Sequence, residues 1–181
     1  MTTLIGFSTS QKKVLEADIV LARQLAMRAV NSLTLTSSGR PGEKTAQLAW
    51  WVFTVESDSR FWDRVEPIRN VYFSFAGRSE TVSIKHDPSP PAANVIEFDA
   101  YVPPGFDNLM FIRDEYFKKQ PRDRAVALIH ESVHLRFRDN PGDGHPGGQI
   151  IMSQPGNIQI GYDDAIRNAY CYQYYADWIS M

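Results

Sequence analysis

Two histidines and a glutamate in the C-terminal third of the chain have a spacing that suits metal-assisted hydrolysis. His130, Glu131 and His134 form the pattern H-E-x-x-H. On a helix the two histidines lie one turn apart on the same face, so both imidazoles can reach a single zinc ion. Glu131 is rotated about a quarter turn away, where it can take a proton from a metal-bound water without being a ligand. The alternative is that both histidines merely cap polar spots on an otherwise apolar helix.

A catalytic zinc site needs a third protein ligand and an open position. The candidates that follow the second histidine are Asp139, Asp143, His145, Asp163, Asp164 and Asp177. Asp139 would turn away from the two histidines if the helix continued. Asp143 lies among the turn-forming residues 140–144, where the chain can reverse and return a carboxylate to the metal. We expect Asp143 to be the third ligand; His145 is the alternative, and a plain turn role for Asp143 stays open.

The elements that must position these residues follow from hydrophobic periodicity and turn signals. Helices are predicted over Gln11–Leu33, with Ser10 as a cap, over Glu43–Phe53, as a short turn at Arg60–Ile68, and over Pro121–Arg138. Short strands are predicted around Val71–Phe75, Thr81–Ile84, Val95–Tyr101 and Leu109–Ile112. Asp163 or Asp164 is expected to cap a last helix. Helices, then strands, then helices indicate an α+β fold.

Composition limits the classes of protein to consider. The chain has 181 residues, a net charge of −2 and 43% apolar residues, which favours one domain over residues 1–181. Without a basic excess we expect no nucleic-acid partner, and the apolar runs are too short for membrane insertion. Residues 1–13 lack the pattern of a signal peptide, which predicts a protein that is cytoplasmic as made. The lone Cys171 cannot form an internal disulfide.

Three stretches resemble the aspzincin family of zinc endopeptidases, which contains deuterolysin and the lysine-specific metallo-endopeptidases. Met110–Ile112, followed by the aromatic turn and Ala127–His134, is similar to the strand and "LIHExxH" helix of the family. Asp143 stands nine residues after the second histidine, as the ligand aspartate of the fungal lysine-specific branch does, within Pro141–Gly147. Asn168–Ala176 is similar to the "NAxxYxxFA" closing helix.

The resemblance implies a zincin-like α+β domain with N-terminal helices, a small sheet, an H-E-x-x-H helix and a C-terminal closing helix. It implies a zinc endopeptidase that acts on a protein or peptide substrate. His130, His134 and Asp143 would bind Zn²⁺, and Glu131 would be the general base. Hydrolysis would then proceed through a metal-activated water with no covalent intermediate.

Two departures from the family pattern affect the expected site. Pro146 replaces a tyrosine that is thought to stabilise the transition state. The residues that could take over this role are His145, Tyr162 and Tyr172. We expect His145 to do so, as a hydrogen-bond donor to the developing oxyanion. Tyr170 and Gln173 correspond to acidic residues of the lysine-specific branch, so nothing expected here would pair with a substrate lysine.

Several further interpretations complete the sequence-based hypothesis. The lack of disulfides and of a signal peptide favours a bacterial toxin or effector that a specialised secretion system exports, with an immunity or delivery protein as partner. Alternatives are a zinc amidase acting on cell-wall peptide and a catalytically impaired, zinc-stabilised binding module. Asn168 or Asp177 could orient a zinc-bound histidine. Cys171 is expected to be a small buried group, and His86 a loop residue.

Overall fold

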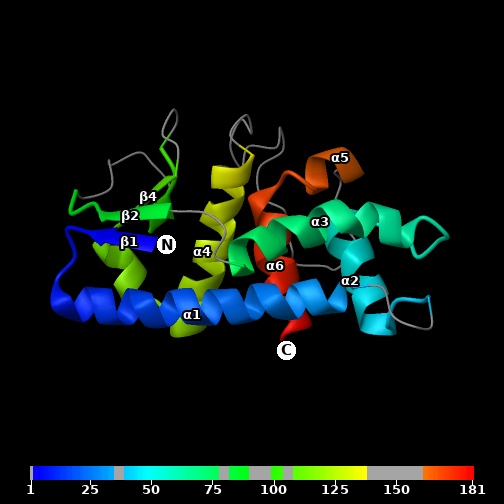
Figure 1. The fold of residues 1–181 in the computed structure, drawn as a ribbon, viewed down its shortest axis with the longest axis horizontal. Helices are drawn as coiled ribbons and strands as arrows, with labels where there is room; N and C mark the ends of the chain where they lie inside the picture. Colours follow the sequence, from blue (N-terminus) through cyan, green and yellow to red (C-terminus); the bar gives the residue numbers. More distant parts are fainter. Residues whose placement is uncertain (1, 35–38, 78–81, 90–98, 104–107, 138–160) are drawn as a thin grey trace.

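The computed structural model describes residues 2–34, 39–77, 82–89, 99–103, 108–137 and 161–181, and it has the expected α+β architecture (Figure 1). The N-terminal elements are β1 (Thr2–Ile5), α1 (Thr9–Ser32), α2 (Glu43–Phe53) and α3 (Phe61–Ala76). The strands β2 (Val82–His86), β3 (Ala100–Tyr101) and β4 (Leu109–Ile112) follow, and then the 3-10 helix η1 (Asp114–Lys118). The last elements are α4 (Pro121–Arg136), α5 (Tyr162–Ala165) and α6 (Ala169–Ile179). Among these described helices, none is both long and apolar enough to cross a bilayer.

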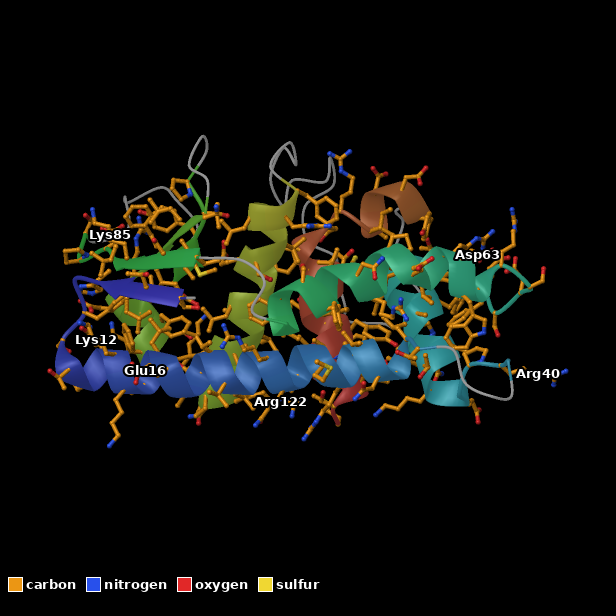
Figure 2. The ribbon with its side chains drawn as sticks, in the orientation of Figure 1. Lys12, Glu16, Arg40, Asp63, Lys85 and Arg122 are labelled. Carbon is orange, nitrogen blue, oxygen red and sulfur yellow. The ribbon has the colours of Figure 1, made fainter. Side chains whose placement is uncertain are left out.

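Helix α1 forms the long base of the molecule. It runs along one side, with the sheet over its N-terminal part and α2, α3 and α6 grouped around its C-terminal half (Figure 1). The helix begins with a capping box in which Ser8, rather than the expected Ser10, accepts from the Gln11 backbone. Its apolar stripe is buried, whereas charged side chains such as Lys12 and Glu16 are exposed (Figure 2). The stripe supplies the surface on which α3, α4 and α6 pack.

Helix α3 corrects the prediction for residues 60–76. The expected short turn at Arg60–Ile68 extends to Ala76 as one helix, so the strand predicted at Val71–Phe75 is wrong. Val71 and Tyr72 are adjacent and both buried, while Phe73 is 58% exposed, a pattern that fits a helix. Val71, Phe73 and Phe75 alternate with other residues, and this suggested a strand because Phe73, although exposed, was counted as a buried apolar residue.

The sheet contains four described strands in the order β1-β2-β4-β3. β1, which the sequence analysis missed, pairs in parallel with β2, and β2 pairs in parallel with β4. β3 is antiparallel to β4, with Ala100 opposite Ile112. The predicted bounds of β4 are confirmed. Of the predicted segment Val95–Tyr101, residues 95–98 lie outside the described residues. The short β3 is therefore an antiparallel edge of an otherwise parallel sheet.

A polar network fixes this edge strand to the sheet. The Tyr101 hydroxyl donates to Asp87 Oδ2 over 2.8 Å, and Arg113 Nε donates to the same oxygen over 3.2 Å. The Ser89 backbone N–H donates to Asp87 Oδ1, and the Tyr101 ring stacks on Phe111. Burial alone would raise the pKa of Asp87, but the hydrogen bonds from Tyr101, Ser89 and Arg113 outweigh it and lower that pKa. The network thus keeps a carboxylate ionised beneath β3.

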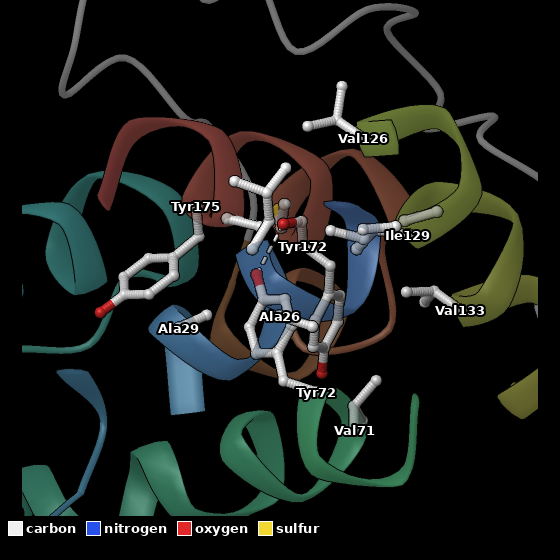
Figure 3. Packing of buried hydrophobic residues seen from close by; sticks show 14 of the residues in the cluster. Ala26, Ala29, Val71, Tyr72, Val126, Ile129, Val133, Tyr172 and Tyr175 are labelled. Carbon is white, nitrogen blue, oxygen red and sulfur yellow. Dashed lines mark hydrogen bonds between the residues drawn. The ribbon is translucent and has the colours of Figure 1, made fainter. Parts of the chain in front are cut away.

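The C-terminal helices pack their aromatic side chains into the core (Figure 3). The Tyr72 hydroxyl donates to the Tyr172 carbonyl oxygen over 2.6 Å, and the Tyr72 ring lies edge-on to the Tyr172 ring. Cys171 is completely buried, as expected, and burial raises the pKa of its thiol. The single last helix that the sequence predicted is in fact two. Asp163 and Asp164 lie within α5 and do not cap it, because Gly161 is at its N-cap. Asn168 caps α6 by accepting from the Tyr170 backbone N–H. This packing holds α6 against the helix that carries the two histidines.

Candidate metal centre and active-site cleft

Helix α4 presents His130, Glu131 and His134 together. Pro121 occupies its first turn, where a backbone donor is not required, and Asp123 complements the positive end of the helix. Apolar residues on several sides bury the helix between α1, α3 and α6. Val126, Ile129 and Val133 on this helix are buried, and Phe137, just beyond its end, is partly buried. The helix is thereby held rigidly along the length that bears the motif.

The two imidazoles converge on one point. His130 Nε2 and His134 Nε2 are 3.2 Å apart, and the ring centroids are separated by 5.0 Å. A zinc ion about 2.0–2.1 Å from two nitrogens at the tetrahedral angle would hold them about 3.3 Å apart. His130 is 6% exposed, and His134 is partly buried. Converging nitrogens fit two ligands of one zinc ion better than they fit two independent polar caps.

Glu131 lies beside the two histidines but outside their meeting point. Its Oε1 is 4.0 Å from His130 Nε2, and the residue is 6% exposed. This distance is too long for a shared hydrogen bond and short enough for a water molecule to contact both the carboxylate and the site. The position suits a general base better than a ligand.

A cleft of about 380 Å³ opens beside His130 and Glu131. It is lined by Asp99, Ala100, Lys119, Asp123, Val126, Ala127, His130, Glu131, Tyr170 and Gln173. The wall formed by α4 follows helical spacing from Asp123 through Ala127 to His130, so periodicity could have predicted it, whereas Lys119 precedes the helix. Ala100 starts the edge strand β3 and Asp99 directly precedes it, and no local pattern pointed to either residue as part of a cleft. An ion pair between Lys119 and Asp99 bridges the two walls.

The closing helix α6 forms the opposite wall. The Tyr170 ring lies edge-on to the His130 ring, with the centroids 4.5 Å apart. Gln173 follows one turn later and also lines the cleft. Tyr170 and Gln173, which were expected to correspond to acidic residues of the lysine-specific branch, therefore both line this cleft. Sequence reasoning noted Tyr170 for its missing charge and missed its ring contact with His130.

The residues predicted as third ligand and as oxyanion donor lie outside the described residues. Asp143 and His145, as well as Asp139, lie within the undescribed residues 138–160. Among the described residues no group of three His, Cys, Asp or Glu side chains could hold a metal ion. Of the three predicted zinc ligands, the structure therefore describes His130 and His134.

Several other candidates lie elsewhere in the structure. The hydroxyl of Tyr162 donates to the Arg64 carbonyl oxygen and that of Tyr172 to the Ile166 carbonyl oxygen, so neither points into the cleft lining. Asn168 caps α6, and Asp177 accepts from Arg122 Nε, so the structure gives neither as a partner of a histidine. His86 ends β2 instead of lying in a loop, and its Nε2 is 2.9 Å from Asp114 Oδ1.

A comparison with solved structures finds a protein of similar fold. The chain is similar to a zinc peptidase from Grifola frondosa, with a TM-score of 0.65 over 94% of this chain and 96% of that one. The chain has the fold of a zinc peptidase. Identity between the two sequences is 19%, so the likeness is one of fold. No family model matches the chain, and no curated protein matches it.

Proposed function

We propose that this chain is a zinc-dependent endopeptidase of the aspzincin type. The observation that supports it most strongly is the convergence of His130 Nε2 and His134 Nε2 to 3.2 Å beside a cleft, in a fold shared with a zinc peptidase. In the proposal Asp143 is the third zinc ligand and Glu131 is the general base. Both roles rest on the sequence pattern and, for Glu131, on its place next to His130.

The residues of the cleft divide the work of peptide hydrolysis. When bound, zinc lowers the pKa of a water molecule toward neutrality and polarises the scissile carbonyl. Glu131 takes the proton from the attacking water and delivers it to the leaving amine. Its nearly complete burial keeps the carboxylate close to the reacting atoms and limits competition from bulk water. His145 donates a hydrogen bond to the developing oxyanion in this scheme.

The edge strand β3 supports an extended substrate. Among the described strands it pairs with β4 alone, and its first residue, Ala100, and the preceding Asp99 border the cleft. A peptide in an extended conformation can add its backbone to such an edge and cross the face of α4. Tyr170 and Gln173 then meet a substrate side chain with neutral groups, so neither of these two positions supplies a charge partner for a substrate lysine.

A toxin or effector role extends this proposal. It rests on the single cysteine, which rules out internal disulfides, and on the proteolytic chemistry that such effectors use. The partner in that case is an immunity protein that covers the cleft, or a delivery protein of a specialised secretion system.

Metal content and proteolysis measured together test the proposed function. We expect about one zinc per chain by elemental analysis and cleavage of an unfolded protein that stops with a chelator and returns with zinc. His130→Ala should lose both, whereas His86→Ala, a histidine outside the cleft, should keep both. Zinc binding without cleavage of any peptide would support a binding module, and cleavage of cell-wall peptide alone would support the amidase. Cleavage that persists without metal would refute the proposal.

A further inference from the structure

A row of aromatic rings leaves the cleft along α6. Tyr170, Tyr174 and Trp178 stand four residues apart and share one face of the helix. The Tyr170 and Tyr174 rings are stacked with centroids 6.1 Å apart, and the Tyr174 and Trp178 centroids are 5.7 Å apart. All three residues are partly exposed. The row therefore presents ring surface to the outside of the molecule.

The aromatic row differs from the face of α6 that stabilises the fold. The opposite face holds Ala169, Tyr172, Tyr175 and Ala176, which are completely buried. The Tyr175 hydroxyl lies 3.1 Å from the Ser32 hydroxyl on α1, so that side of the helix is anchored inward. Trp178 also packs partly against the core, but the three neighbouring rings together form one contiguous, partly exposed aromatic patch, and contiguous apolar patches are typical of binding sites.

The first ring of the row belongs to the proposed active site. Tyr170 lines the cleft and contacts the His130 ring edge-on at 4.5 Å. At the far end Arg122 donates to Asp177 Oδ1 over 2.5 Å and to the Asp177 carbonyl oxygen, which joins the start of α4 to the last turn of α6. The row is thus continuous with the cleft and lies on α6, which contacts α4 at both ends of the row.

The spacing of the rings matches an extended polypeptide. Side chains on one face of an extended chain recur about every 6.6–6.8 Å, close to the 6.1 and 5.7 Å between the rings. From Tyr170 to Trp178 the helix rises about 12 Å, which corresponds to three or four extended residues. An alternating pattern of apolar side chains can therefore meet successive rings.

We propose that Tyr174 and Trp178 form an extended binding surface for the substrate. Its occupant is the stretch of polypeptide that leaves the cleft, with large apolar or aromatic side chains at alternate positions within about four residues of the scissile bond. This inference rests on the proposed peptidase function and names the substrate class that the same site prefers. Tyr170 links the two parts because its ring contacts both His130 and Tyr174.

Paired peptides measure the contribution of the row. A short peptide spans the cleft alone, and a long peptide adds leucine or phenylalanine at alternate positions, with polar residues between them, on both sides of the scissile bond. We expect the long peptide to have the higher kcat/KM. In Trp178→Ala the ratio of kcat/KM for the long peptide to kcat/KM for the short peptide should fall about tenfold, because one aromatic contact with its buried area contributes about that factor. Tyr174→Ala should lower the same ratio. Phe73→Ala, which removes a 58% exposed ring on α3, should leave the ratio unchanged.

Binding to an inactive protein separates this inference from the proposed function. Glu131→Gln protein is titrated with the labelled long peptide, with and without Trp178→Ala, after thermal unfolding shows that each variant is folded. Weaker binding through Trp178→Ala supports the surface even if no peptide is ever cleaved, in which case the peptidase proposal alone fails. Equal ratios and equal affinities in Trp178→Ala and Phe73→Ala would overturn the surface. Tighter binding of a chitin oligosaccharide than of the long peptide would overturn a polypeptide as its occupant.

Discussion

Removing the carboxylate of Asp18 should weaken the attachment of the site helix. Asp18 lies in α1 and is 2% exposed. Arg124 of α4 donates to both of its oxygens, through Nε over 2.7 Å and Nη2 over 3.0 Å, and the Tyr116 hydroxyl donates over 3.2 Å. Arg124 stands six residues before His130 on the same helix. Asp18→Ala therefore leaves a guanidinium without its carboxylate next to the core.

The expected loss follows from the burial of the pair. Removing one partner of a buried ion pair costs about 3–5 kcal/mol, because the remaining charge is uncompensated. The Arg124 side chain is 11% exposed and can partly turn to water, so we expect the lower end, about 3 kcal/mol in the free energy of unfolding. For a chain of this length that corresponds to a decrease in Tm of about 6–12 °C.

Urea denaturation followed by circular dichroism measures this difference. The titration is performed with a chelator so that bound metal adds no stability. Glu16→Ala removes the same charge from an exposed position of α1 and should change the free energy of unfolding by less than about 0.5 kcal/mol. In Asp18→Leu/Arg124→Met, apolar groups replace both charges, and much of the lost stability should return. If Asp18→Ala costs no more than Glu16→Ala, the pair does not anchor α4.

Three further outcomes are expected. Glu131→Gln should retain zinc in elemental analysis while kcat falls at least about a hundredfold, because an amide cannot accept the proton; parental activity would exclude Glu131 as the base. Asp143→Ala should lower zinc affinity strongly, whereas His145→Ala should keep zinc and lose turnover; the opposite pattern would indicate a three-histidine site. Because the pKa of Asp87 is lowered in the folded chain, its stabilisation is complete above the unfolded value of about 3.9 and is lost as the pH falls through and below it. Asp87→Asn should therefore flatten the dependence of Tm on pH below about 4, and parallel curves would contradict this.

Features that depend on neighbouring residues could be predicted from the sequence. The helix at Glu43–Phe53 and the strand at Leu109–Ile112 have the expected bounds, and α4 begins at Pro121 as expected. The convergence of two histidines four residues apart follows from the helical repeat alone. Local periodicity predicted a strand within α3 because the exposed Phe73 ring was counted as a buried position. It missed the short strand β1, which pairs with a strand about 80 residues away.

The cleft was decided by tertiary structure. Tyr170 meets His130 because α6 packs against α4, and Asp99 reaches the same cleft because β3 pairs with β4. Asp18 is bound by Arg124 and Tyr116, which lie about a hundred positions away from it in the chain. A helical repeat specifies which side chains share a face, but it contains no information about the element that the face will meet. That choice is made by packing among elements distant in sequence, where the burial of apolar area and the pairing of buried charges are settled together.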